Sequence, residues 1–454
     1  MQQMLSESVQ ASVRPHECRN TYYATAAMPS YKDHGGGLVE NSAVQCFPAV
    51  VENRFVTALP SLNSGAQNTI TFNPDGLISD IIVTASLPVP VLASGASAGQ
   101  NGIGLGLTRG WLYQMVEQIT VRYAGSSLYT FGGEQTLLEN LFDAEDSVKR
   151  DNLLVLGGAE LASPSDWQNA SLLQASIYIK LPHNSISAQE KPIGFPTDAI
   201  SAPVQIQIKW RNFSDVFIVN AVSGGPTEAQ VAATIPGAFS AAEMQFRQAH
   251  LNNRDDSITA REDLSKHALS VPLKYFPQTQ FTATLPSQNT PSYQINLTGF
   301  RSGSVQGILA WAVRSGDLTS TTARNRLNYI PLRSVVLSVN GLNYYVANNN
   351  SSQLWTLCER KTAGQFSETN LVWNSGTSVY DAPTQAGYYT WIPFAQGIET
   401  LRDESMMTNG LGIANSVVNC QVDTGLPNTE VQIFFTYLYN CTLLCSGGSA
   451  DYVF

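Results

Sequence analysis

The sequence has few charged side chains. Asp, Glu, Lys and Arg together account for 13% of its 454 residues, which is about half of their usual share in soluble globular domains. Serine, threonine, asparagine, glutamine and glycine take their place. A surface of this composition is more typical of a protein that packs against copies of itself than of a freely diffusing enzyme.

Positive charge is especially scarce. The chain has 25 Lys and Arg against 35 Asp and Glu, for a formal net charge of −10. No stretch forms a basic arm, since residues 1–40 hold only Arg14, Arg19 and Lys32 against four acidic side chains. Direct wrapping of nucleic acid needs Lys and Arg to displace counterions. The composition therefore argues against sequence-specific or general nucleic-acid binding.

Long apolar runs, a secretory signal and a regular cysteine pattern are also missing. The longest apolar run, residues 431–445, is interrupted by polar residues and is too short to span a membrane, so we expect a buried strand there. The first residues lack the charged and apolar parts of a signal peptide. The six cysteines are sparse and irregular, as in a reducing compartment. Cys441 and Cys445 could form half of a metal site, but no second Cys or His pair follows them, which favours ordinary buried thiols.

No catalytic motif stands out. A G-x-S-x-G nucleophile turn is absent, and the five histidines are scattered. His183 follows an expected strand and could be a ligand, but a loop histidine is the favoured interpretation. Gly102, Gly104 and Gly106 resemble a phosphate-binding loop only superficially, because Arg109 stands where a dinucleotide fingerprint needs its third glycine.

The densest charge cluster comprises residues 254–256 and 261–263. Its carboxylates could bind a cation, but they lack EF-hand spacing, so a solvated or interfacial ion-pair loop is favoured. We therefore predict no catalytic residue, no cofactor and no metal ion. Paired carboxylates on a β scaffold leave no sequence signature, so this prediction rests on the absence of recognisable motifs.

One strand–turn–strand pattern occurs twice. In residues 118–129 apolar and polar residues alternate with the period of a half-buried strand, and Gly125 then permits a tight turn. Residues 334–345 repeat the alternation in the same phase, and their Asn340-Gly341 pair is a strong hairpin signal. After the first copy, Leu137, Leu138, Leu141 and Phe142 have helical spacing, as do Leu354, Trp355 and Cys358 after the second.

Other segments repeat in the same order. Upstream of the two hairpins, residues 68–72 and 81–85 resemble 293–297 and 307–311; downstream, residues 175–182 and 204–210 resemble 388–393 and 431–435. The shift is nearly constant, at about 220 residues, which indicates tandem domains rather than a solenoid. Two unrelated β domains with similar strand patterns are the alternative.

The many short strands, long connections and few helices predict an all-β protein with two tandem eight-stranded jelly-roll sandwiches and a short helix in each. The expected division is an N-terminal arm at 1–44, a first jelly roll at 45–222, a linker at 223–242, a second jelly roll at 243–446 and a tail at 447–454. Residues 134–154 form the one convincing helical region of the first jelly roll, and we expect its charged residues, Glu139 among them, to face solvent. The arm has no periodic apolar pattern, so we expect it to dock on a neighbouring molecule or to fray.

Three segments resemble a known family. Residues 174–182, with their Leu181-Pro182 step, lead through Pro192–Pro196 into the alternating strand 204–210. Residues 116–125 precede Gly133-Glu134 and a helix, and residues 389–394 resemble the equivalent strand of the second domain. This arrangement is similar to the double jelly-roll major capsid proteins of icosahedral DNA viruses, the lineage of nucleocytoplasmic large DNA viruses, virophages, polinton-like viruses and adenoviruses.

The resemblance implies a homotrimer of two-domain subunits. Its six jelly rolls would form a pseudo-hexagonal capsomer that tiles the shell of the virion, in contact with neighbouring capsomers, minor capsid or penton proteins and, as a further candidate partner, an internal membrane. The resemblance is loose, and the arm and the Cys/Tyr-rich residues 437–441 depart from it.

Two alternatives stay open at this point. A tandem jelly-roll protein that binds or processes glycans would carry a secretory signal and a cleft with paired acids. A shell protein of a small RNA virus would carry a basic inner arm.

Overall fold

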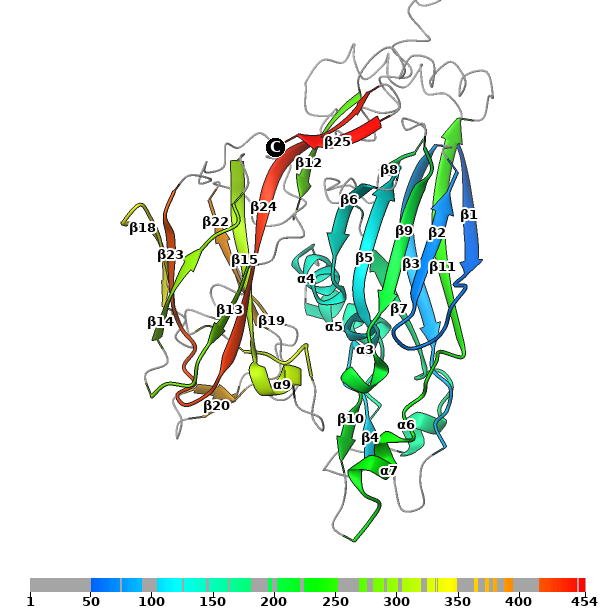
Figure 1. The fold of residues 1–454 in the computed structure, drawn as a ribbon, viewed down its shortest axis with the longest axis horizontal. Helices are drawn as coiled ribbons and strands as arrows, with labels where there is room; N and C mark the ends of the chain where they lie inside the picture. The colour runs from blue at the N-terminus through cyan, green and yellow to red at the C-terminus, as the bar shows by residue number, and fades with distance from the viewer. Residues whose placement is uncertain are drawn as a thin grey trace, which may run out of the picture.

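A computed structural model gives the arrangement of the chain (Figure 1). The structure describes residues 50–73, 76–91, 104–124, 126–143, 147–161, 164–179, 181, 195–197, 202–220, 224–251, 269–275, 281–289, 292–300, 304–319, 325–330, 332, 334–348, 363–365, 372–374, 379–381, 388–394, 416–446 and 449–453. The predicted arm at 1–44 lies outside these residues. No helix in the described part of the chain is long and apolar enough to cross a membrane.

The first sandwich consists of two antiparallel sheets. Sheet I has the order β1 (Val50–Ala58), β11 (Ala241–Leu251), β3 (Leu77–Ser86) and β7 (Gln174–Ile179), with β8 (Phe195–Pro196) also beside β3. Sheet II has the order β2 (Gln67–Phe72), β9 (Val204–Trp210), β5 (Val116–Tyr123) and β6 (Ser126–Phe131). Along β2 and β9 buried and more exposed residues alternate, as the sequence pattern predicts. A separate pair, β4 (Gly104–Gly106) and β10 (Ile218–Asn220), lies at one end.

The second sandwich has the same plan. Sheet III has the order β12 (Leu269–Tyr275), β24 (Val431–Ser446), β15 (Ser304–Arg314), β22 (Tyr388–Pro393) and β19 (Ala363–Gln365). Three further strands join it: β13 (Phe281–Leu285) and β25 (Ser449–Val453) pair with β24, and β16 (Tyr329–Ile330) pairs with β15. Sheet IV has the order β14 (Ser292–Leu297), β23 (Val418–Asp423), β17 (Ser334–Val339) and β18 (Leu342–Asn348). The short hairpin β20 (Val372–Asn374) and β21 (Val379–Asp381) stands apart from both.

The strand order therefore repeats between the sandwiches. In sheet II, Ile206 pairs with Ile70 on one side and with Val121 on the other. In sheet IV, Cys420 pairs in the same way with Ile295 and Leu337. All six side chains are buried in their cores. The repeated hairpins at 118–129 and 334–345 occupy equivalent positions, and the predicted duplication is confirmed for them.

One predicted correspondence is wrong. Residues 204–210 form β9, the second strand of sheet II, and the second strand of sheet IV is β23, not the strand that contains 431–435. Residues 431–435 belong to β24, whose counterpart in sheet I is β11. Both segments begin Val-Gln-Ile. A local apolar–polar alternation cannot tell which of two sheets a strand joins.

The two hairpins share a bulge and a left-handed turn residue. The register shifts between Val121 and Arg122 in one hairpin and between Leu337 and Ser338 in the other. The turn residue is Ala124 in the first, with φ 47°, and Asn340 in the second, with φ 51°. Gly341 follows Asn340 at φ 82°, as a two-residue hairpin turn with positive φ at both positions requires.

Strand pairing changes the predicted domain boundaries at three places. Residues 243–251 lie in β11, which pairs with β1 and β3, so they belong to the first sandwich and not to the second. The expected linker contains α7 (Glu228–Ala232), whose Val231 is buried in the core of the first sandwich. The expected tail contains β25, which extends sheet III through β24. No local pattern predicts the first of these pairings, because β1 and β11 lie far apart in the sequence.

Three helices of the first sandwich lie on the side that faces the second (Figure 1): α3 (Trp111–Met115), α4 (Gly133–Asp143) and α5 (Ser147–Leu156). The short helices α6 (Pro164–Gln168) and η3 (Phe213–Asp215) also belong to the first sandwich, and α9 (Ser315–Thr319) follows β15 in the second. Leu137, Leu138 and Leu141 of α4 are fully buried, which confirms the predicted apolar face. Glu139 is also buried, contrary to the prediction of a solvated face, because it accepts hydrogen bonds from Tyr129 Oη and Gln135 Nε2. The predicted helix at Leu354, Trp355 and Cys358 lies outside the described residues.

Candidate functional site: the contact between the two sandwiches

Two strands of sheet III, β15 and β24, have buried residues on both of their faces. Along β15, Ile308, Ala310 and Ala312 face the core of the second sandwich. The alternate residues Leu309, Trp311 and Val313 join the core of the first sandwich instead. All six have relative exposures of 3% or less. A strand that is covered on both faces needs a nearly continuous apolar run, and Gly307–Val313 has one.

Strand β24 follows the same rule. Ile433, Phe435 and Tyr437 face the second core, while Leu438 joins the first core and Phe434 packs against it. Trp311 and Phe434 stack with ring centroids 5.5 Å apart and an interplanar angle of 15°. The two sandwiches therefore share one continuous apolar contact, which fixes their relative position.

Side chains of α3 and α4 meet this contact from the first sandwich. Leu327 of the second sandwich is buried in the first core, and a Cβ atom at Gly110, which precedes α3, would lie 3.0 Å from Leu327 Cδ1. Gly133 begins α4 at a still closer approach: a Cβ there would lie 1.9 Å from the carbonyl oxygen of Tyr113. Glycine is required at Gly133 because the displaced atom would be backbone, which cannot rotate away. This close approach explains why glycine precedes Glu134 in the sequence.

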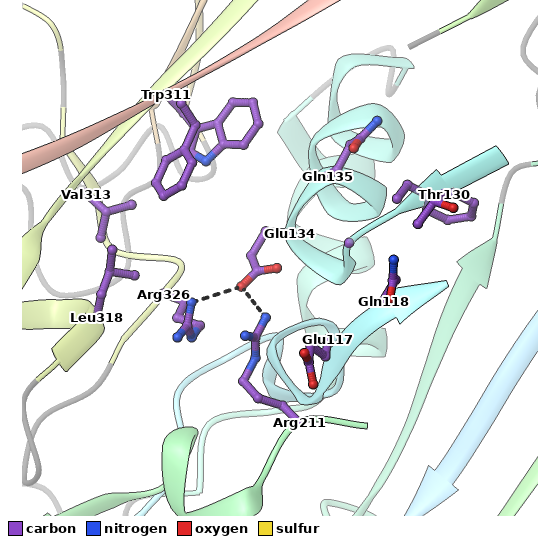
Figure 2. Close-up of a pocket in the computed structure, with 13 residues that line it drawn as sticks. Glu117, Gln118, Thr130, Glu134, Gln135, Arg211, Trp311, Val313, Leu318 and Arg326 are labelled. Atoms are coloured by element: carbon purple, nitrogen blue, oxygen red, sulfur yellow. Dashed lines mark hydrogen bonds and ion pairs between the residues drawn. The ribbon is translucent and has the colours of Figure 1, made fainter. Parts of the chain in front are cut away.

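An ion-pair network crosses the contact (Figure 2). Glu134 of α4 accepts a hydrogen bond from Arg211 Nη2 at 3.0 Å within the first sandwich. Its Oε1 atom also lies 3.8 Å from Nη1 of Arg326, which comes from the second sandwich. The three side chains are only 15–24% exposed. Attraction between partly buried charges is screened less than at the open surface, so the network favours the closed contact.

Gln114 of α3 holds the same two arginines through neutral groups. Its side-chain oxygen accepts from the backbone N–H of Arg326 at 3.1 Å, and its side-chain nitrogen donates to Thr108 at 2.7 Å. Its backbone oxygen accepts from Arg211 Nε at 3.0 Å. The side chain of Gln114 is fully buried. A buried amide whose oxygen and nitrogen both have hydrogen-bond partners favours one docking geometry.

The loop that carries Arg326 is held by Asp317 of α9. Asn325 N–H donates to the carbonyl oxygen of Asp317, and Asn328 Nδ2 donates to its carboxylate at 2.8 Å. Burial raises the pKa of the Asp317 carboxyl, and the hydrogen bond from Asn328 and the nearby Arg314 oppose this only in part. Burial also raises the pKa of Tyr329, which follows in β16.

A cleft of about 390 Å³ lies beside the network. Two acidic side chains line it, and each already binds a cation: Glu134 as described, and Glu117 with Lys209 at 2.8 Å. Figure 2 shows Glu117 and Gln118 on one side of the cleft and Trp311 and Leu318 on the other. The geometry is that of a bridged domain contact rather than of a general acid beside a free base or nucleophile.

The structure describes some of the residues that the sequence analysis considered as sites. Gly104 and Gly106 form the ends of β4, which pairs with β10, and Arg109 follows on the same segment. Cys441 and Cys445 lie in β24, and Cys420 of β23 is a buried free thiol whose pKa burial raises to about 12. His183 and the cluster at 254–256 and 261–263 lie outside the described residues. Within the described residues no group of three or more His, Cys, Asp and Glu side chains could hold a metal ion.

The network residues were missed by the sequence analysis. Glu134, Arg211 and Arg326 are far apart in the sequence, and each is an ordinary charged residue. One feature of the sequence could have drawn attention to them. Charged residues are few in this chain, so two partly buried arginines are unusual.

Comparison with known proteins identifies the fold. No family model matches the sequence, and no curated protein matches it. Among solved structures, the chain is similar to VP54 of PBCV-1, fitted into a reconstruction of the virophage Sputnik, with a TM-score of 0.56 and 13% identity over 90% of this chain and 97% of that chain. The structure of the Sputnik virophage matches with a TM-score of 0.51 and 11% identity over 88% of both chains. The major capsid protein of Faustovirus matches with a TM-score of 0.50 and 10% identity over 88% of this chain and 91% of that chain. The predicted all-β double jelly-roll fold is confirmed.

Proposed function

We propose that the protein is a major capsid protein of an icosahedral DNA virus. One observation carries this proposal: two jelly rolls of the same strand order are locked side by side through a buried apolar contact. Matches to the PBCV-1, Sputnik and Faustovirus structures over most of the chain support it. The protein is located in the shell of the virion.

Three copies of the chain form one capsomer. A subunit made of two similar sandwiches contributes two of six similar blocks, so a three-fold trimer has a nearly hexagonal outline. Such an outline tiles a flat lattice. Neighbouring capsomers are then the principal partners, and minor capsid or penton proteins and an internal membrane are further partners.

The role of the protein is structural and not enzymatic. The two acidic side chains of the cleft are engaged in ion pairs: Glu117 with Lys209 within sheet II, and Glu134 with Arg211 and, across the contact, with Arg326. No observation favours the glycan-binding or glycan-processing alternative. In the capsomer, residues 1–44 form an arm on the inner side, and their balanced charge suits contact with protein or membrane rather than with packaged nucleic acid.

Strand pairing suggests a revised domain division. The first jelly roll extends through β11, to residue 251, and the second extends from β12 through β25, to residue 453. The segment 252–268 then connects the two.

Mass measurement of the purified protein tests the proposal. We expect one species at three times the chain mass of 49.2 kDa at micromolar concentration, because obligate interfaces of this kind bury on the order of 2,000–5,000 Å². A stable monomer under the same conditions would count against a capsomer-forming protein.

A further inference from the structure

The outer face of sheet II is polar along its whole width. Directly paired residues point to the same side of a sheet, so strand pairing defines the rows of this face. The rows are Gln67, Lys209 and Gln118; Thr69, Gln207, Thr120 and Thr130; and Thr71, Gln205, Arg122 and Ser127. They hold two cations and no acidic residue, which is unusual in a chain with a net charge of −10.

A cavity of about 270 Å³ opens in this face. Thr120 and Thr130 are only 8% and 3% exposed although they lie on the outer side, because longer side chains surround them. The cavity has room for about nine water molecules at roughly 30 Å³ each, so a small ion fits. Its lining residues are Gln67, Gln118, Thr120, Arg122, Ser127, Thr130, Gln207 and Lys209.

Hydrogen bonds among these residues leave donors aimed at the cavity. The hydroxyl oxygens of Ser127 and Thr130 lie 2.9 Å apart, and Thr130 donates to Thr120 Oγ1 at 3.4 Å. The hydroxyl proton of Thr120 is therefore left for an acceptor in the cavity. The side-chain oxygen of Gln207 accepts from Gln67 Nε2 at 3.0 Å, which likewise leaves the NH₂ group of Gln207 to donate.

Arg122 is the strongest of these donors. Its Nε atom is buried and has no hydrogen-bond partner among the described residues. A buried donor without an acceptor costs free energy, and the cost is larger for a charged group. Lys209 adds a second cation, and its ammonium group has three donors, of which Glu117 takes one at 2.8 Å. The cavity therefore suits a ligand that carries negative charge and several acceptors.

The second sandwich has the same scaffold without this set of donors. By strand register, the residues of sheet IV at three of these positions are Ser338 for Arg122, Val336 for Thr120 and Asp423 for Lys209. One cation is lost, one is replaced by an acid, and a buried hydroxyl is replaced by a methyl group. A four-stranded sheet of this plan therefore folds without the donors, so the fold alone does not explain their presence in sheet II.

We propose that this cavity, hereafter the sheet II site, binds a small oxyanion of the phosphate or sulfate type. The groups that bind it are the Arg122 guanidinium, the Thr120 hydroxyl, the Gln207 amide and the Lys209 ammonium. Arginine matches the oxygens of such an ion well, and charge-assisted hydrogen bonds are the stronger ones. A neutral sugar would leave the Arg122 charge without a counter-charge. The inference goes beyond the proposed function, because it assigns a ligand rather than a role in assembly.

Calorimetric titration of the full-length protein tests the inference. The probes are inorganic phosphate, sulfate and methyl phosphate, each added at constant ionic strength so that screening does not change. Arg122→Ser and Thr120→Val introduce the residues that sheet IV carries, so the sheet should tolerate both. Arg54→Ser is the control, since it removes an exposed arginine from β1 in sheet I with the same change in charge. Circular dichroism checks the fold of each variant.

We expect one phosphate or sulfate ion per chain with a Kd of about 0.1–1 mM, because an ion with so few atoms can gain only limited affinity. Arg122→Ser should weaken binding by about 10-fold or more, and Thr120→Val by about 3-fold. Arg54→Ser should change it by less than about twofold. Methyl phosphate that binds as well as phosphate identifies an ester group of a larger molecule as the ligand; binding of the inorganic ions alone identifies a free ion. Both results support the site.

Three outcomes overturn the inference. The first is the absence of saturable binding by any of the three probes up to about 10 mM. The second is unchanged binding in both Arg122→Ser and Thr120→Val, which puts the site elsewhere. The third is an equal loss in Arg54→Ser, which indicates diffuse attraction of anions to the surface. Binding is measured whether or not the protein forms trimers, so failure here is distinct from failure of the proposed function.

Discussion

The ion-pair network between the two sandwiches allows a prediction that the ion-pair distances alone would not give. Two ion pairs are compared by double-mutant cycles: Glu134 with Arg326, at 3.8 Å, and Glu117 with Lys209, at 2.8 Å. The first pair is 18–24% exposed and joins two domains, whereas the second is 38–44% exposed and lies within one sheet. Exposed pairs contribute little because water and salt screen them.

We expect the longer but more buried pair to have the larger coupling energy. At an effective dielectric constant of about 20, two unit charges near 4 Å attract by about 4 kcal/mol before desolvation and side-chain ordering are subtracted. Partial exposure and a second cation on Glu134 reduce the measurable coupling to about 1 kcal/mol. For Glu117 and Lys209 we expect about 0.3 kcal/mol.

The variants are Glu134→Gln, Arg326→Gln, Glu117→Gln and Lys209→Gln, alone and in their two pairs. Urea denaturation at a fixed protein concentration gives each free energy of unfolding, since oligomers make stability depend on concentration. Raising the salt concentration should reduce the coupling of the exposed pair more. A larger coupling for Glu117 and Lys209 would refute the view that the network holds the two sandwiches together.

Three further predictions follow from single positions. Gly133→Ala should destabilise the protein by more than about 3 kcal/mol, because the new Cβ would overlap the Tyr113 carbonyl oxygen. The control Gly316→Ala should be tolerated, because a Cβ at Gly316 would have no atom within 4 Å. Soluble yield and thermal unfolding measure both variants. Ala124→Asn should stabilise by up to about 1 kcal/mol in urea denaturation, because Ala124 has φ 47° and asparagine tolerates that conformation better; an unchanged midpoint would count against strain there. Burial raises the pKa of Asp317 in the folded protein above its ordinary value of 3.8, so the folded form keeps the proton to a higher pH than the unfolded form, and this group lowers the free energy of unfolding as pH rises from 3.8 through the folded pKa. Asp317→Asn should flatten that part of the curve of stability against pH, and an unaltered slope would contradict the assignment.

Much of the fold could be predicted from local patterns. The hairpins at 118–129 and 334–345 follow from alternation and turn chemistry, and the chain forms them at equivalent positions with the same bulge. Strand β24 is apolar on both faces, and its sequence already shows this in residues 431–439. What the pattern could not show is which neighbours a strand has, and for this reason β9 was matched to the wrong counterpart.

The contact between the sandwiches could not be predicted from the sequence. Glu134 meets Arg211 and Arg326 only because α4 begins at the glycine that fits under Tyr113 and because Gln114 fixes the Arg326 backbone. Glu139 likewise is buried because Tyr129 and Gln135 happen to meet it in the folded chain. Both depend on long-range geometry, which no spacing along the chain encodes.

Electron microscopy of the purified full-length protein tests the central claim most directly. The account predicts blocks of hexagonal outline with three-fold symmetry, in which two similar densities per subunit alternate around the ring, and shells or flat sheets of these blocks at higher concentration. Isolated two-lobed particles, or rings whose subunits are not built from two similar lobes, would contradict it.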